Sequence, residues 1–381
     1  MRVCLVYDCL FPYTVGGAER WYRNLADELV RDGHEVTYLT RRQWPEGEPP
    51  QVEGVRVVGV SPGGELYTED GRRRIGPPLR FGLGVLRHLT RNRRSYDVVH
   101  GCSFPYFSLL ATRLALAGRD VTIGVDWFEV WSRGYWREYL GPAGGAIGAA
   151  VQRLCARLTP LAFAFSDVHA ARLREEGLHG EPVRLSGLYA GSLEAHADTA
   201  PAEPLLLFAG RHIPEKRAHL LPAAVAAARS SLPGLRGLVL GDGPERGRVL
   251  AEIERLGLDG MVEAPGFVGA EEVEAALARA TCMLLPSSRE GYGMVVIEAA
   301  AAGTPSVVVA GPDNAAVELI DEGENGFVAA SPEPADIAGA VLRVHEGGDA
   351  LRARTAAWFE RNAPLLAASS SAREIARRYE R

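Results

Sequence analysis

With 381 residues, the chain is too long for one ordinary hydrophobic core, so two domains of under 200 residues each are expected. The net charge of −6 argues against a general nucleic-acid-binding protein, and no nucleic-acid partner is predicted. The five cysteines form no C-x-x-C pair, which argues against a zinc site or a disulfide framework and favours a reducing cytosol. The chain enters directly into a strand and has no uncharged apolar run of membrane-spanning length. Neither a signal peptide nor a transmembrane helix is therefore predicted.

The basic residues show a strong bias. Of the 42 lysines and arginines, only Lys216 is a lysine. This suggests a coding preference that replaces lysine by arginine wherever the chemistry permits. A planar guanidinium does not replace a compact ammonium at a tight phosphate site, so Lys216 is a candidate functional residue. Alternatively, the lysine at position 216 has survived by chance.

The first half of the chain alternates strand-like and helix-like segments, which predicts a doubly wound parallel sheet. A buried strand at 2–8 is followed by a loop with Gly16 and Gly17 and by a helix at 21–32. Glycines before a helix N-terminus can let backbone approach a diphosphate, although they are also common there for packing reasons. Further strands are predicted at 34–40, 54–60, 97–100, 121–126 and 161–166, the last of which would close the sheet.

Residues 79–94 are predicted to form a helix with an apolar face flanked by arginines. Such a helix could lie on an anionic membrane or contact a lipid acceptor. The alternative is an ordinary helix that packs on the sheet and has a basic outer face. We expect a cytoplasmic protein that could be peripheral to the inner membrane face through this segment.

Two predicted strands end in polar residues, His100 and Asp126, and aromatic residues from Trp127 onward follow the second. The carboxyl ends of parallel strands meet at one edge, so these side chains are expected to collect at one rim. Aromatic faces and polar groups suit a sugar or a polyketide-like acceptor, but aromatic residues also pack in cores. We predict His100, Asp126 and Trp127 as acceptor-binding residues.

The domain boundary is predicted from composition. Residues 191–204 contain glycine and prolines with little periodicity, which indicates a linker. It would join an N-terminal acceptor-binding domain, residues 1–190, to a C-terminal donor-binding domain, residues 205–362. A C-terminal helix within 363–381 would pack back on the N-terminal domain.

The second half begins a new α/β unit. A strand at 205–210 leads to Arg211 and Lys216, two cations beside a helix N-terminus, a combination that binds a diphosphate. The next strand ends at Gly241 in a Gly-Asp-Gly-Pro turn, where backbone can approach a ligand closely. An edge strand then ends at Gly266 and Phe267, and its backbone could pair with a planar base.

Two carboxylates lie eight residues apart across a loop-to-helix junction, Glu290 in the loop and Glu298 in a helix at 294–302. Strand-like runs flank this helix, so its N-terminus is expected at the carboxyl edge of a parallel sheet, where ligands bind. Glu290 could accept hydrogen bonds from a sugar, and Glu298 could hold a ribose. Backbone N–H groups around Gly291 and Gly293 could bind a phosphate. Alternatively, both carboxylates are solvated surface charges.

Two Rossmann-like halves joined by a linker would face each other across a cleft, a site suited to transferring a sugar from a nucleotide diphosphate. In their order and spacing the motifs resemble the retaining glycosyltransferases of family four, which have the GT-B fold, over essentially the whole chain. The matching pieces are Gly-Gly-Ala-Glu at 16–19, Gly210 and Arg211 with Lys216, Gly-Asp-Gly-Pro at 241–244, and Glu290 with Glu298 in an E-x7-E arrangement.

The resemblance implies that Arg211 and Lys216 hold the diphosphate and neutralise it as it leaves. Glu290 would contact the hydroxyls of the donor sugar and Glu298 the ribose, while residues 16–17 would contact the phosphates from the opposite domain. It also implies retention of anomeric configuration by front-face attack, with no metal and no other cofactor.

One departure from the family is visible. Members commonly have a histidine just after the strand at 121–126, and this chain has none there. Asp126 is the nearest polar residue and takes that place by resemblance. The candidate catalytic residues are thus Arg211, Lys216, Glu290 and Asp126. The candidate donor-binding residues are Gly16, Gly17, Arg211, Lys216, Gly241, Gly266, Phe267, Glu290, Gly291, Tyr292, Gly293, Met294 and Glu298.

Several alternatives stay open. UDP is the favoured base, with GDP and dTDP possible, and the acceptor hydroxyl could belong to a sugar, a lipid-linked sugar or a small natural product. A nucleotide-sugar epimerase of the same architecture and a non-catalytic nucleotide-sugar-binding subunit are the alternative functions. A NAD-dependent dehydrogenase is disfavoured because no G-x-G-x-x-G follows the first strand.

Overall fold

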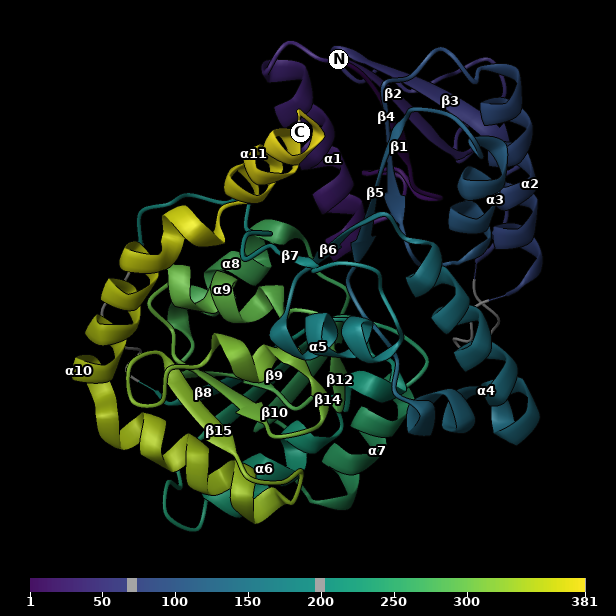
Figure 1. Cartoon of the computed structure of the whole chain (residues 1–381). Coiled ribbons are helices and arrows are strands. Elements are labelled where there is room, and N and C mark those ends of the chain that lie inside the picture. Colours follow the sequence, from purple (N-terminus) through teal and green to yellow (C-terminus); the bar gives the residue numbers. More distant parts are fainter. Residues whose placement is uncertain (67–73, 196–202, 381) are drawn as a thin grey trace. The chain divides into compact units, whose positions relative to one another are not determined.

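The computed structural model describes residues 1–66, 74–195 and 203–380. These residues divide into two compact units, one made of residues up to 190 together with 367–380, the other of residues 191–366 (Figure 1). Of the predicted linker at 191–204, residues 196–202 lie outside the described part of the chain.

The first unit contains a parallel sheet with the strand order β3-β2-β1-β4-β5-β6-β7. The order reverses between β1 and β4, as in a doubly wound fold, which confirms the predicted fold class. The prediction that residues 161–166 close the sheet is wrong, because Val183 of β7 pairs with Phe163 outside β6. The strands are β1 (Arg2–Val6), β2 (Glu35–Arg41), β3 (Val55–Ser61), β4 (Val98–Cys102), β5 (Thr122–Trp127), β6 (Leu161–Ala164) and β7 (Val183–Arg184).

The helices of the first unit cover both faces of its sheet. They are α1 (Gly17–Arg31), α2 (Gly76–Arg91), α3 (Phe107–Ala115), α4 (Arg133–Leu158), α5 (Asp167–Glu175) and, from the end of the chain, α11 (Ala368–Tyr379). The crossovers that contain α2, α3 and α4 all run in one direction along the sheet, so right-handed connections place these helices on one face. The connection through α1 runs the other way, and α11 packs against α1.

The second unit repeats this plan with a parallel sheet in the order β10-β9-β8-β11-β13-β15. Its strands are β8 (Leu205–Ala209), β9 (Arg236–Leu240), β10 (Val262–Gly266), β11 (Cys282–Leu285), β13 (Ser306–Val309) and β15 (Gly326–Ala329). Two short strands, β12 (Arg289–Glu290) and β14 (Asp313–Asn314), form a separate parallel pair beyond the ends of β11 and β13. The predicted position of β10 at the edge is confirmed.

Among the helices of the second unit, α9 begins at Met294, as predicted. The helices of this unit are η1 (Pro214–Lys216), α6 (Leu220–Ala228), α7 (Arg246–Arg255), α8 (Ala270–Arg279), α9 (Met294–Ala301), η2 (Ala315–Leu319) and α10 (Pro334–Leu366). Arg217, at φ 50°, adopts a left-handed conformation that separates helix α6 from η1. Helix α10 is interrupted at Gly348 and continues to Leu366, past the predicted end of the donor-binding domain at residue 362.

The core of each unit is apolar. In the second unit, buried leucine, valine and alanine side chains of α6, α10 and the central strands form one cluster. No helix in the described ranges is both long enough and apolar enough to cross a bilayer.

Candidate active site

The predicted donor-site residues of the second unit lie at the carboxyl edge of its sheet. Strands β8, β9, β10, β11 and β13 are parallel neighbours, so the loops that follow them gather at that edge. The loop after β8 carries Arg211 and Lys216, and the segment after β11 carries Glu290. The fold therefore brings together residues that are far apart in the sequence.

Lys216 and Glu290 are in direct contact. The Lys216 ammonium donates to Glu290 Oε1, and Ser287 Oγ donates to the same oxygen at 2.7 Å. The Glu290 side chain is 8% exposed and that of Lys216 is 23% exposed. The pair is therefore a partly desolvated cation and anion at the edge where ligands bind in such sheets, and one face of Lys216 remains accessible.

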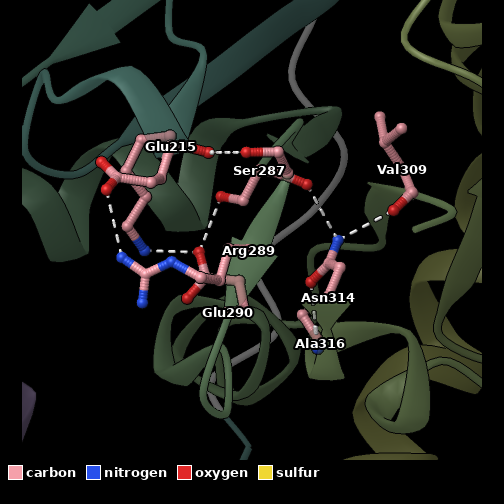
Figure 2. A network of polar contacts seen from close by, with 9 residues as sticks. Glu215, Ser287, Arg289, Glu290, Val309, Asn314 and Ala316 are labelled. Carbon is pink, nitrogen blue, oxygen red and sulfur yellow. Dashed lines mark hydrogen bonds and ion pairs between the residues drawn. The ribbon is translucent and has the colours of Figure 1, made fainter. Parts of the chain in front are cut away.

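A second ion pair holds the same two segments together. Arg289 Nη2 donates to Glu215 Oε1 at 3.1 Å, and the backbone N–H of Ser288 donates to the Glu215 carbonyl at 2.8 Å. Figure 2 shows Glu215, Arg289 and Glu290 within one polar network. Burial lowers the pKa of the Arg289 guanidinium to about 10, and the Glu290 and Asp313 carboxylates act in the opposite direction. Arg289 thus keeps its charge at neutral pH. The turn that carries Lys216 is held to the segment of Glu290 by the contact of Lys216 and by those of Glu215.

Asn314 connects this network to the neighbouring strand. Its Nδ2 donates to the carbonyls of Ser287 at 3.2 Å and Val309 at 2.8 Å, while its Oδ1 accepts from the backbone N–H of Ala316 at 3.1 Å (Figure 2). Asn314 also pairs with Glu290 in the β12–β14 ladder. The backbone that presents Glu290 is therefore held by hydrogen bonds rather than left as an open loop.

Close backbone contact explains the glycine at 241. Gly241 has φ 118°, and a Cβ atom there would lie 1.9 Å from the Gly210 carbonyl oxygen. The Gly241 N–H donates to the Gly266 carbonyl at 2.9 Å. The predicted close approach at this turn thus occurs between the ends of β8, β9 and β10, where only glycine fits.

The helix that carries the second carboxylate begins where it was predicted. Helix α9 starts at Met294 after Gly291, Tyr292 and Gly293. Gly293 has φ 103°, and a Cβ there would approach that of Ala316 to 2.6 Å, so this entry into the helix requires glycine. Glu298, four residues after Met294 on the same helix, is half-buried.

Two predicted donor-binding residues are well exposed at this edge. Arg211 is exposed beyond the end of β8, and Phe267 is 78% exposed beyond the end of β10. Neither touches the Lys216–Glu290 pair through a hydrogen bond within the described residues. Both are accessible to a ligand.

Gly16 and Gly17 belong to the first unit. Gly16 caps the N-terminus of α1 in an extended conformation, and Gly17 is the first residue of that helix. No atom lies within 4 Å of a Cβ placed at Gly17. The predicted open turn before a helix N-terminus is present, and its contact with a donor stays a prediction.

The three predicted acceptor residues lie inside the first unit. His100, Asp126 and Trp127 are all 0% exposed. Asp126 Oδ2 accepts from Trp21 Nε1 at 2.7 Å and lies 2.9 Å from His100 Nε2, and His100 Nδ1 lies 2.6 Å from the Tyr379 hydroxyl. Because α1 and α11 cover these strand ends, the structure gives no support to direct contact with an acceptor.

The residues that surround the pair were not predicted. Ser287, Arg289 and Asn314 follow buried strands, and Glu215 precedes Lys216. Ser287 lies two residues beyond the apolar strand β11, a position that could have indicated it, whereas Asn314 lies five residues beyond β13 and has no such signal. Nothing in one sequence indicates that Arg289 pairs with Glu215, 74 positions away.

Two family profiles match the chain. The "Glycosyl transferase 4-like domain" matches residues 16–187, and "Glycosyl transferases group 1" matches residues 194–358. The two matches follow the division into units and include all the candidate site residues described above.

Similar proteins and structures span the whole chain. Glycogen synthase of Mycobacterium tuberculosis is 28% identical, over 95% of this chain and 90% of its own. Sucrose-phosphate synthase from Thermosynechococcus elongatus superimposes with a TM-score of 0.79 at 18% identity, over 100% of this chain and 98% of the other. Anabaena HepE, solved in complex with UDP-glucose, superimposes with a TM-score of 0.73 at 19% identity, over 100% and 99%. At these identities the structures show the fold alone.

Proposed function

The chain belongs to family four of the glycosyltransferases, which have the GT-B fold, and we propose that it moves a sugar from a nucleotide diphosphate to a hydroxyl acceptor with retention of configuration. The observation that carries this proposal is the contact between Lys216 and Glu290 at the carboxyl edge of the second sheet. A cation for the diphosphate and a carboxylate for the sugar lie side by side where such sheets bind ligands.

Lys216 and Arg211 would bind the diphosphate. As the bond from the sugar to the diphosphate breaks, negative charge grows on the departing oxygen, and a fixed cation stabilises that charge. Lys216 is suited to this role because Glu290 and the η1 turn hold its ammonium in place. Arg211, exposed at the same edge, would supply the second cation.

Glu290 would accept hydrogen bonds from the hydroxyls of the donor sugar, and Glu298 from the ribose. The Glu290 carboxylate is oriented by Ser287 and Lys216, which reduces the cost of fixing it when a sugar binds. The N-terminus of α9, with residues 291–294, would lie near the phosphates and favour their negative charge.

Transfer with retention would follow a front-face route. The acceptor oxygen would form a bond to the anomeric carbon on the face from which the diphosphate leaves, and the acceptor proton would pass to the departing phosphate oxygen. The family resemblance supports this route. The anomeric configuration of the product, measured by NMR, tests it directly, and an inverted product would contradict retention.

UDP is the base we propose, with GDP and dTDP as alternatives. Its support is the HepE protein of the same fold, which has been solved with UDP-glucose. We propose no metal or other cofactor, so chelation with EDTA should leave turnover unchanged.

The acceptor hydroxyl would belong to a sugar, a lipid-linked sugar or a small natural product. We also propose that residues 79–94 give the protein a peripheral contact with the inner membrane face. All five cysteines are buried free thiols, which suits the reducing cytoplasm.

The test is turnover with a panel of nucleotide sugars and acceptors, with the released nucleotide and the glycosylated product both quantified. We expect both to appear in equal amounts and only when an acceptor is present. Interconversion of the donor sugar without an acceptor would instead indicate an epimerase. Donor binding without turnover on any acceptor would indicate the non-catalytic subunit.

A further inference from the structure

Exposed apolar side chains are concentrated on three helices of the first unit. Large apolar side chains are exposed at 14 of the described positions, and seven of these lie in or next to α2, α3 and α4. The most exposed large apolar residue within each helix is Leu83 (59%) in α2, Leu114 (64%) in α3 and Ile147 (67%) in α4. The others are Ile75, Leu79, Leu140 and Leu154. Exposed apolar residues that gather on one surface, unlike ones scattered singly, mark interaction sites.

The three helices form one layer. Each contributes to the same core cluster on one face of the sheet, α2 through Phe81, α3 through Leu109 and α4 through Cys155. Helix α3 contacts both α2 and α4, and Figure 1 shows α2 and α3 side by side. The exposed side chains therefore lie on the sides of the helices that face away from this shared core.

Within α2 and α4 the exposed apolar residues follow helical spacing. Leu79 and Leu83 are four positions apart on α2, and Ile147 and Leu154 are seven apart on α4. The stretch of α4 from 139 to 152 contains no charged residue. Helices α2 and α4 thus each have one apolar stripe toward the core and another toward solvent.

The charge of this layer is opposite to that of the chain. The helices α2, α3 and α4 contain eight arginines and one acidic residue, Glu138, a net charge of +7 with histidine neutral, whereas the whole chain has −6. Exposed arginines lie beside the apolar stripe on α2, after the stripe on α4, and on the first segment of α4, which a kink at Gly141 (φ 74°) separates from that stripe. They are Arg80, Arg87, Arg91, Arg133, Arg137 and Arg157.

We infer that the outer face of α2, α3 and α4 docks on a lipid bilayer that contains anionic lipids. Leu83, Leu114 and Ile147 enter the boundary between headgroups and acyl chains, and the arginines contact lipid phosphates. The interface of an anionic bilayer binds helices that lie in its plane and carry apolar side chains flanked by arginines. The inference rests on the membrane contact proposed for residues 79–94 and extends it to a surface of three helices.

The experiment is co-sedimentation of the full chain with vesicles. Phosphatidylcholine vesicles with and without phosphatidylglycerol are compared, at low and high salt. The α2 variant is Leu83→Ser with Arg87→Ser, and the α4 variant is Ile147→Ser with Leu154→Ser. The matched control is Arg361→Ser with Leu365→Ser on α10, where Leu365 is 63% exposed.

The wild type should sediment with the phosphatidylglycerol vesicles, less so at high salt, and little with phosphatidylcholine alone. Each of the two test variants should bind about tenfold more weakly, because each loses two side chains that contribute at the interface. The control should bind as the wild type does. Sugar transfer to a water-soluble acceptor should be the same in all four proteins, so failure of transfer is distinguishable from failure of docking.

Three results would overturn the inference. If only the α2 variant loses binding, the contact is confined to residues 79–94 and the three-helix surface is wrong. Equal sedimentation with both kinds of vesicle, or with neither, excludes recognition of anionic lipid. A dimer in solution that only the α4 variant dissociates would identify a second copy of the chain as the occupant.

Discussion

Lys216 and Glu290 share a hydrogen bond across 74 positions of the chain, and Ser287 donates to the same carboxylate oxygen at 2.7 Å. Lys216 is the only lysine among the 42 basic residues of the sequence. Glu290 is the first carboxylate of the E-x7-E arrangement. The site proposed for a diphosphate and a sugar therefore holds its cation and its carboxylate in contact in the absence of a ligand.

Replacing either member of this pair should abolish transfer without unfolding the protein. We expect Lys216→Ala and Glu290→Ala each to lower kcat by about a hundredfold or more, because loss of one fixed electrostatic partner costs that much in comparable sites. Lys216→Arg should also be impaired, since a guanidinium fork does not reproduce a compact ammonium. Steady-state kinetics with circular dichroism on each variant provides the measurement.

The control for this prediction is Arg361→Ala, which removes an exposed cation of the same unit that is paired with Glu324 at 3.3 Å. It should turn over normally. Near-normal turnover by Lys216→Ala or Glu290→Ala would remove the assignment of the site.

The Arg289–Glu215 pair should contribute both to the stability of the folded protein and to donor binding. Arg289→Met removes a charged partner of Glu215 where the two side chains are 13% and 17% exposed, so unfolding should become easier by about 1.5–3 kcal/mol. The KM for the donor should rise, because the turn that carries Lys216 loses an anchor. Urea denaturation and donor kinetics are measured on the two single variants and the double variant Arg289→Met with Glu215→Met.

In that double-mutant cycle we expect a coupling energy of about 1 kcal/mol or more. The exposed pair Arg361–Glu324 serves as the reference and should show a coupling energy near zero. Equal coupling energies in the two cycles would refute a special role for Arg289.

Asp126 should behave as an interior residue. Burial and the Asp126 charge raise the pKa of the Tyr22 and Tyr379 hydroxyls well above the usual value, so both phenols remain protonated. We expect Asp126→Asn to destabilise the protein by about 1–3 kcal/mol and Tyr379→Phe by about 1 kcal/mol. The KM for the acceptor should be unchanged below the melting temperature.

Thermal denaturation and acceptor kinetics on these two variants distinguish an interior role of Asp126 from an acceptor-side role. A loss of transfer in Asp126→Asn with unchanged stability would instead support the acceptor-side role that the family resemblance implies for this position.

Stability should fall as the pH drops below about 6.5, and His212 should contribute to this fall. Its ring is 0% exposed, and burial lowers its pKa below the usual 6.5. Between the lowered pKa and about 6.5 the unfolded chain binds a proton that the folded chain does not, so stability rises with pH through that window and is lost as pH falls. Burial lowers the pKa of His34, His88 and His219 as well.

The measurement is urea denaturation from pH 5 to pH 8 on the wild type and on His212→Asn, with exposed His179→Asn as the control. The slope of stability against pH should be shallower in His212→Asn alone. An identical slope in all three proteins would show that His212 does not titrate as its burial implies.

Local patterns were sufficient to predict both sheets and the glycine turns. Alternating apolar strands and helices indicate the doubly wound units, and the required glycine at Gly293 marks the start of α9. The two-residue strand β7 was missed because two residues carry no periodicity.

The side-chain contacts of the site could be predicted only in part. Lys216 and Glu290 are recognisable from residue type and spacing. The pairing of Arg289 with Glu215 depends on how β12 lies against the η1 turn, which no local pattern encodes. Asp126 ends the predicted strand, where a surface residue would lie, but it is buried beneath α1 and α11: Trp21 of α1 donates to it, and Tyr379 of α11, from the other end of the chain, contacts its neighbour His100.

The most direct test of the proposed function is a thermal-shift panel of UDP, GDP, dTDP and their common sugar conjugates, on the wild type and on Lys216→Ala. A ligand at 100-fold its Kd stabilises a protein by about 2.7 kcal/mol, which gives a clear shift. We predict that one base, UDP first, stabilises the wild type and that Lys216→Ala loses the shift. No shift with any nucleotide, or an undiminished shift in Lys216→Ala, would contradict a nucleotide-diphosphate site at Lys216 and Glu290.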